Sequence, residues 1–231
     1  FFIYSNVSFK QNYDKHLETW DRVYRLSGEI NLPDNENIHA LLGPRLGPAL
    51  KDEIPAVENM TRLSPFQEKC NIKANENNYF EEQVYYADST VFEVFPLKFL
   101  YGTPANALVG KSRTVISESL AQKYFGKKDV LGEQIEVNNR NFTITGITRD
   151  LPSNVHHKLH FLLSISSVPA AVRDLLDKEY SENYWRPYCF TFVLLKGKSS
   201  PGDLKNAFSS FYEKNMKPFG DQLQASFNLI I

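Results

Sequence analysis

Three of the five histidines lie within five residues of one another, and clustered histidines are common metal ligands. On an extended segment, His156 and His160 share one face, while His157 points to the other. No glutamate follows His156 in the HExxH spacing of zinc proteases. We therefore expect the cluster to lie in a loop and at the start of a strand, and we predict no metal site.

A serine, a histidine and an aspartate also occur close together, as Asp150, Ser153 and His156. A catalytic triad needs groups from separate elements, which such close spacing does not supply. The GxSxG turn that exposes a serine nucleophile is absent from the sequence. We interpret residues 150–154 as a turn.

The glycines of the middle third occur singly, at Gly102, Gly126, Gly132 and Gly146. None belongs to a GxGxxG or GxxxxGKS phosphate-binding loop, so the sequence predicts no nucleotide or other cofactor. Any ATP chemistry must then reside on another chain or domain. We assign no catalytic, cofactor-binding or metal-binding residues, and we expect that the chain is not an enzyme.

The only cysteines are Cys70 and Cys189. Two cysteines are too few for a disulfide scaffold, and their spacing fits neither a zinc ribbon nor a CxxC redox motif. The sequence leaves open whether they pair.

Aromatic residues concentrate in one part of the middle third. They are Tyr79, Phe80, Tyr85, Tyr86, Phe92, Phe95 and Phe99. The simplest interpretation is the core of a small subdomain, and a groove for an aromatic ligand or partner is the alternative.

The overall composition is that of a folded domain rather than a disordered chain. The chain has 231 residues, of which 42% are hydrophobic, with 17 Phe and 12 Tyr. Its 26 basic and 27 acidic residues give a net charge of -1. This balance argues against a nucleic-acid binder and against a polybasic membrane-surface module.

No run approaches the ~20 apolar residues of a transmembrane helix, and no signal peptide is recognisable at the start. The sequence begins at Phe1 and ends at Ile231. We expect both ends to be cuts through a longer protein.

The first and last thirds share one pattern of elements. Residues 22–30 and 57–63 are predicted strands around a helix that contains Leu46 and Leu50, after a polar turn at 33–37. Residues 189–195 and 223–230 are predicted strands around a helix that starts at Ser200 and closes at Pro218. Each set is a βαβ or split-βαβ unit.

The middle is rich in short strands. We predict strands at 70–74, 79–87, 99–101 and 114–116, with a hairpin over 134–147. Short helices are predicted at 89–95 and at 118–125, where Ser117 is the N-cap and Gly126 the stop. The buried face of the second helix includes Tyr124 and Phe125. A strand at 159–165 and a helix at 168–180 follow.

These elements predict an α+β fold in which two βαβ-like halves, near 22–64 and 188–230, share one sheet. We place the inserted β-rich subdomain at residues 66–154. Residues 1–65 and 155–231 would form the other subdomain. The turn residues near 64–68 and 152–158 would be the crossings.

Several stretches resemble one family. Residues 86–97 and 100–108 resemble the "aD..fF.vF.f.ll.Gdp..aL" stretch of MacB-like periplasmic core domains, the extracytoplasmic domains of FtsX-like ABC transporter permeases. Residues 115–126 are similar to their "vvlteslAkkyFG" stretch. Residues 142–156 are similar to "f.VtGv..d.P.nsH", with Val155 where serine is usual. Residues 13–25 match the "sYD.fh.na.riYRv" start.

The resemblance covers nearly the whole chain and implies a porter-like α/β subdomain with a β-rich insert. It also implies a place on the periplasmic side of the bacterial inner membrane, between two helices of a permease that a cytoplasmic ATPase drives. The long Asn-rich loops are most similar to permeases of Bacteroidetes-type bacteria. A second copy of the domain, as a homodimer or an internal duplicate, and a periplasmic adaptor are the other implied partners.

The resemblance makes a non-catalytic domain that couples ATP hydrolysis to periplasmic motion in efflux or extrusion the leading hypothesis. A periplasmic binding or adaptor-docking module is the alternative, and an enzyme comes third. The motifs consist of caps, turns and core aromatics, so they name no substrate.

Overall fold

Segments from the first and last thirds of the chain fold together, and the middle third forms a second unit. The computed structural model describes residues 18–32, 35–66, 69–152, 155, 157–177 and 181–231. Unit 1 contains the described residues of 1–21 and 65–167. Unit 2 contains those of 22–64 and 168–231.

The sheet of unit 2 has the strand order β13-β1-β12-β3, and each neighbouring pair is antiparallel. These strands are β1 (Val23–Leu32), β3 (Val57–Pro65), β12 (Phe190–Leu195) and β13 (Ser226–Ile230). β1 and β3 therefore run in the same direction with β12 between them, and β12 and β13 do so with β1 between them. The two halves are split βαβ units whose strands interleave in one sheet.

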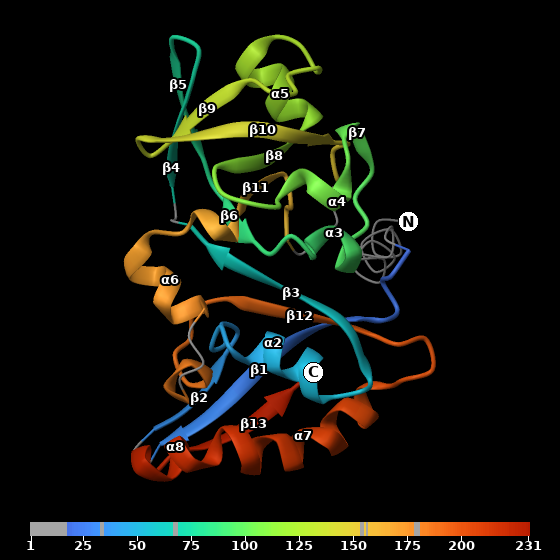
Figure 1. Ribbon diagram of the computed structural model, residues 1–231, viewed down its shortest axis with the longest axis vertical. Helices are drawn as coiled ribbons and strands as arrows, with labels where there is room; N and C mark the ends of the chain where they lie inside the picture. Colours follow the sequence, from blue (N-terminus) through green and yellow to red (C-terminus); the bar gives the residue numbers. More distant parts are fainter. Residues whose placement is uncertain (1–17, 33–34, 67–68, 153–154, 156, 178–180) are drawn as a thin grey trace, which may run out of the picture. The chain divides into compact units, whose positions relative to one another are not determined.

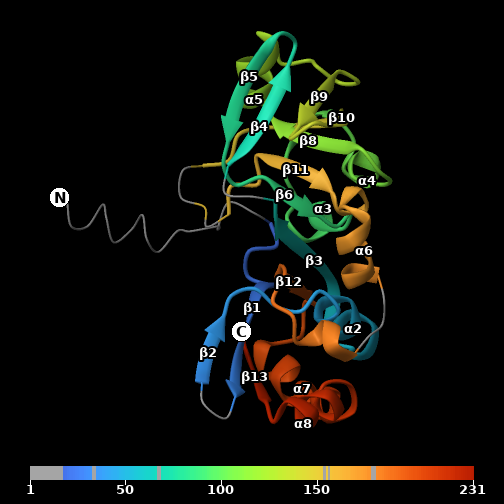
Figure 2. The same ribbon diagram turned by 90° about the vertical axis from the view of Figure 1, so that its left-hand side faces the viewer.

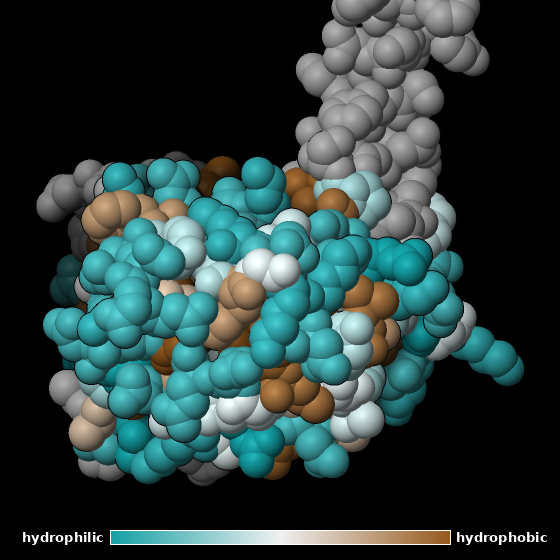
Figure 3. Space-filling model, turned by 90° about the horizontal axis from the view of Figure 1, so that it is seen from above, coloured by the Kyte–Doolittle hydropathy of each residue, from teal (hydrophilic) through white to brown (hydrophobic). Residues whose placement is uncertain are grey.

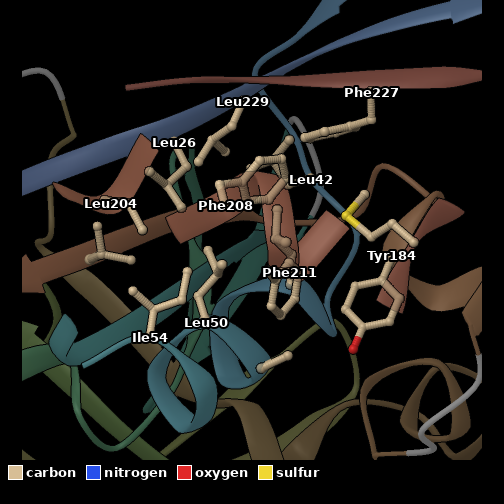
Figure 4. Close-up of a cluster of buried hydrophobic side chains, with 14 of the residues drawn as sticks. Leu26, Leu42, Leu50, Ile54, Tyr184, Leu204, Phe208, Phe211, Phe227 and Leu229 are labelled. Carbon is tan, nitrogen blue, oxygen red and sulfur yellow. The ribbon is translucent and has the colours of Figure 1, made fainter. Parts of the chain in front are cut away.

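Helices cover one face of this sheet and enclose the core of unit 2 (Figure 4). They are α2 (Leu46–Glu53), α7 (Pro201–Asn215) and α8 (Lys217–Leu223). The expected start of α7 is confirmed: Ser200 and Asp203 form a reciprocal capping box, with Pro201 in the first turn. The core residues labelled in Figure 4 are Leu26, Leu42, Leu50, Ile54, Tyr184, Leu204, Phe208, Phe211, Phe227 and Leu229.

Two expectations for unit 2 were wrong. Residues 35–37 belong to β2 (Asn35–His39), which pairs with β1, and not to a polar turn. Pro218 does not close α7. It lies in the first turn of α8, where its missing N–H costs nothing, and the final strand starts only at Ser226.

The sheet of unit 1 has the strand order β6-β11-β8-β10-β9-β4-β5, and β7 also pairs with β10 (Figures 1 and 2). The strands are β4 (Cys70–Ala74), β5 (Asn77–Glu81), β6 (Tyr85–Ala87), β7 (Phe99–Gly102), β8 (Arg113–Ser117), β9 (Gln134–Val137), β10 (Arg140–Thr148) and β11 (Phe161–Ser164). The β9–β10 hairpin turns through Asn138 and Asn139, which both have positive φ, a conformation that asparagine tolerates.

The described residues of unit 1 include three α-helices: α3 (Val91–Val94), α4 (Pro104–Ala107) and α5 (Glu118–Phe125). The end of α5 is as expected, because Gly126 is left-handed at φ 68°. Tyr124 is buried, but Phe125 at the last position is partly exposed, which corrects the expected buried face. The largest fully buried side chains of this unit include Phe142, Phe161, Ile116 and Ile144.

The described residues of 155–167 fold with the middle of the chain. β11 pairs with β6 in parallel and with β8 in antiparallel register, so the strand lies inside the sheet of unit 1. The boundary between the units therefore follows Ser167, and not residue 154 as expected. A hydrophobic strand joins the sheet in which it finds pairing partners, whatever its position in the sequence. Unit 1 also includes Thr19, whose hydroxyl donates to the Val94 carbonyl at 2.7 Å.

Between β11 and β12, the chain forms α6 (Ala170–Asp177) and two short 3-10 turns, Ile165–Ser167 and Ser181–Tyr184. The expected helix at 168–180 is thus present over its central part. Among the described helices, none combines the length and the apolar character that crossing a bilayer requires.

Candidate functional site

The histidine segment is only partly described, because His156 lies outside the described residues. The ring of His160 is half-buried, and its Nδ1 lies 3.0 Å from the Lys158 carbonyl oxygen. Burial disfavours the charged imidazolium and lowers the pKa of His160. In the part of the chain that the structure describes, no three His, Cys, Asp or Glu side chains gather in a metal-binding group.

The pKa of His160 predicts a pH effect on stability. A histidine whose pKa is lower in the folded state takes up protons preferentially when unfolded, below its usual pKa of about 6.5. The free energy of unfolding should therefore fall as the pH drops from about 7 to about 5. Denaturant titrations of wild type and His160→Gln should show a smaller fall in the variant. An equal fall in both proteins would contradict this assignment.

Asp150 supports a helix rather than a triad. Its Oδ1 accepts a hydrogen bond from the Ser119 hydroxyl at 2.7 Å and from the Ser119 N–H at 3.3 Å. Burial opposes ionisation of this carboxyl, but the hydrogen bonds from Ser119 and Ser117 outweigh it and lower the pKa of Asp150. The carboxylate therefore anchors the first turn of α5. Ser153 and His156 lie outside the described residues.

The two cysteines are both buried thiols and form no disulfide. Cys70 begins β4 of unit 1, and Cys189 in unit 2 forms an isolated β-bridge with Leu42.

The aromatic residues of the middle third are mainly core. Tyr85, Tyr86, Phe92 and Phe95 are buried, and the rings of Phe92 and Phe99 meet edge to face at 4.8 Å. Phe80 is the exception, with 61% of its surface exposed. Seen from the end of unit 1, the surface is largely hydrophilic, with scattered apolar residues (Figure 3).

Unit 1 contains a polar cluster that no local sequence pattern indicates. Glu81 of β5 is nearly buried, and its Oε1 lies 2.5 Å from Nζ of Lys123 on α5. Burial and the neighbouring Glu81 carboxylate raise the pKa of Tyr124. The ring of Tyr124 also packs on Tyr79 at 4.9 Å. These contacts tie the β4–β5 hairpin to α5, so we assign the cluster a structural role.

A groove of about 560 Å³ lies along β13 and α7 in unit 2. Its α7 side consists of Lys205, Phe208, Ser209, Tyr212 and Glu213. Its other side consists of residues 226–230 together with Glu29 of β1, whose carboxylate accepts a hydrogen bond from the Asn228 side chain at 2.7 Å. We name this the β13–α7 groove.

A smaller groove of about 310 Å³ lies between the end of α2 and α7. A hydrogen bond from the Lys214 ammonium lowers the pKa of the Glu53 carboxyl, and the two side chains meet at 2.8 Å. Because this pair already connects the two helices, the groove offers less open polar surface than the β13–α7 groove does.

The comparisons with known proteins are consistent with the fold described above. A family model described as the MacB-like periplasmic core domain matches residues 5–210. No curated protein was found to match the sequence.

Three solved structures illustrate the structural similarity. A domain assigned to a permease protein of Porphyromonas gingivalis has a TM-score of 0.78 and 22% identity, over 92% of this chain and 90% of that one. The periplasmic region of MacB from Actinobacillus actinomycetemcomitans has a TM-score of 0.57 and 12% identity, over 90% and 88%. The extracellular domain of the noncanonic ABC-type transporter YknZ from Gram-positive bacteria has a TM-score of 0.56 and 13% identity, over 90% and 100%. At these identities the similarity concerns the fold alone.

Proposed function

The chain belongs to the MacB-like periplasmic core domain family, and on that premise we propose that it transmits motion within an ABC transporter. The domain would stand on the periplasmic side of a bacterial inner membrane as part of a permease. A cytoplasmic ATPase would supply the energy, and the domain would couple ATP hydrolysis to periplasmic conformational change for efflux or extrusion. The observation that carries this proposal is the family match over residues 5–210.

The residues fit a mechanical role better than a chemical one. The polar clusters that the structure describes, around Asp150 and around Glu81, hold secondary structure elements together. Each unit has its own core, with large aromatic side chains such as Phe208 in unit 2 and Phe161 in unit 1. A rigid unit can pass on a displacement without deforming, because close-packed interiors have low compressibility.

A docking module remains the second candidate, and the β13–α7 groove is the observation that favours it. A periplasmic adaptor, or a second copy of the domain, would be the partner. The two candidates differ in what happens to the ATPase cycle, since a docking module need not respond to it.

Replacing the domain by a flexible Gly/Ser linker in the parent permease tests the proposal. The ATPase should still bind to the permease and hydrolyse ATP, while transport falls to background. A matched permease that carries only the exposed substitution Lys111→Glu should transport normally. Normal transport by the linker variant would contradict a coupling role.

A further inference from the structure

The outer edge of β13 is open within the described part of the chain. β13 stands at the end of the strand order, and β1 occupies its inner side. In several peptide-recognition domains, an extended peptide adds a strand to such an edge. The β13–α7 groove follows this edge, and its volume of about 560 Å³ is that of a ligand-binding cleft.

The helix and the strand that border the groove run in opposite directions (Figure 1). The rings of Phe208 and Phe227 lie 5.8 Å apart, which fixes where α7 and β13 lie side by side. Lys205, which precedes Phe208 on α7, therefore lies toward the carboxyl end of β13. Glu213, which follows Phe208, lies toward Ser226 at the start of β13. The two charges thus stand toward opposite ends of the groove.

Both of these charges are open to a ligand. Lys205 and Glu213 are exposed, and both line the groove. Neither side chain forms an ion pair with another described residue, and Lys217, one turn after Glu213, pairs instead with Asp221 at 2.7 Å. Ser209 lies four residues from each charge, and its small side chain leaves room between them. A ligand with one charge of each sign would match this surface.

The separation of the two charges matches an even number of strand residues. The eight residues from Lys205 to Glu213 span about 12 Å of helix. Four residues of an extended strand span about 13 Å, and side chains four positions apart lie on the same face. A strand antiparallel to β13 runs in the same direction as α7, so it meets Lys205 first. Its side chains toward α7 would be an acidic residue and, four residues later, a basic one.

The chemistry of the occupant favours another protein over a strand of this chain. Residues 225–231 have the sequence Ala-Ser-Phe-Asn-Leu-Ile-Ile, which contains no charged side chain. A second copy of β13 would therefore leave Lys205 and Glu213 without partners on the added strand. An antiparallel arrangement is favoured because parallel pairing is slightly less stable per residue.

We propose that the β13–α7 groove binds an extended peptide segment of another protein, which adds a strand antiparallel to β13 and carries an acidic residue four positions before a basic one. Main-chain hydrogen bonds to β13 supply affinity, and ion pairs with Lys205 and Glu213 supply direction and sequence preference. The residue midway between the two charges would face Ser209 and the half-buried ring of Tyr212, so an apolar side chain fits there. This gives the docking candidate a partner of defined chemistry, and it does not depend on the coupling role.

A capped peptide with the sequence Thr-Glu-Thr-Val-Thr-Lys-Thr tests the charge pattern. Titration calorimetry with the full chain should show saturable binding, with a dissociation constant of about 10–500 μM. Lys205→Glu should weaken binding about threefold or more, because it replaces an attractive pair by a repulsive one. The variant K205E/E213K should instead prefer the peptide in which Glu and Lys are exchanged. Lys111→Glu, the same charge change in unit 1, should have no effect.

Methylation of the peptide backbone tests strand addition. In an antiparallel pair, every second residue of the added strand directs its N–H toward its neighbour. Two versions of the peptide are N-methylated on alternate sets of residues. One version should bind about tenfold or more weakly than the parent peptide, because it loses hydrogen bonds to β13, and the other should bind within about threefold of the parent. Equal affinities for the two versions would overturn strand addition.

The proposal fails if the parent peptide shows no saturable binding up to about 5 mM, or if K205E/E213K keeps the preference of wild type. A dimer of the chain that the peptide dissociates in sedimentation equilibrium would assign the groove to a second copy and would also overturn it. These outcomes leave the coupling function intact, because that function is tested by transport in the linker variant. Conversely, a transport-competent linker variant would contradict coupling while peptide binding persisted.

Discussion

Replacing Phe208 or Phe211 by alanine is expected to lower the free energy of unfolding of unit 2 by about 3–5 kcal/mol. Both rings are buried, and they stack on each other at 5.7 Å (Figure 4). Phe208 also meets Phe227 of β13 at 5.8 Å, and Phe211 meets Tyr184 at 5.9 Å. Truncation would leave a cavity between α7 and the sheet that the neighbouring side chains cannot fill.

Denaturant titration followed by the fluorescence of Trp185 measures this loss, since Trp185 is buried in the same core and packs on Phe227. A Trp20→Phe background removes the other tryptophan, which is half exposed. Tyr124→Ala should be similarly costly in unit 1, whereas Phe125→Ala should cost less because that ring is partly exposed. A Phe208→Ala variant as stable as wild type would contradict the assignment of α7 to a rigid core.

Locking the two copies together is expected to abolish transport. If the domain passes motion to its partner, a covalent bond between the copies should stop the cycle. A pair of cysteines at facing positions of the two copies in the assembled transporter provides this lock. ATP binding should survive, because we place the nucleotide site on another chain or domain.

Reductant provides the control for the locked transporter. Transport should return when the disulfide is reduced, and the single variants should transport normally throughout. Full transport with the two copies linked would contradict the proposal that the domain transmits motion, and would favour the adaptor-docking alternative.

Local patterns in the sequence predicted much of unit 2. The strands at 22–30 and 189–195 were identified from runs of β-branched and aromatic residues. The start of α7 was identified from Ser200, Pro201 and Asp203, whose cap is formed as expected. These signals succeed because caps and amphipathic faces depend on residues only three or four positions apart.

The failures depend on contacts distant in sequence. Residues 35–37 look like a turn, yet they become a strand because the exposed part of β1 offers them a partner. β11 belongs to unit 1 because its neighbours are β6 and β8, which no local pattern reveals. Pro218 is expected to end a helix, but proline is equally well tolerated in the first turn of a new helix.

The β13–α7 groove was missed for the same reason. Lys205 and Glu213 are ordinary exposed charges in the sequence, and the final strand gives no sign of lying at an edge. Only the sheet order places β13 outermost among the described strands of unit 2. The polar cluster of Glu81, Lys123 and Tyr124 likewise joins elements that are far apart in the sequence.

The coupling proposal is tested most directly by a distance measured between the two copies during the ATPase cycle. In the assembled transporter, a spin label at the exposed position Lys198 of each copy would report this distance by pulsed electron paramagnetic resonance. Labels at Lys198 and Gln222 of one copy provide the internal control, because both positions lie in unit 2. We predict that the distance between copies changes between the ATP-bound and nucleotide-free states while the internal distance stays constant. An unchanged distance between copies in a transporter that is hydrolysing ATP and moving substrate would contradict the proposal.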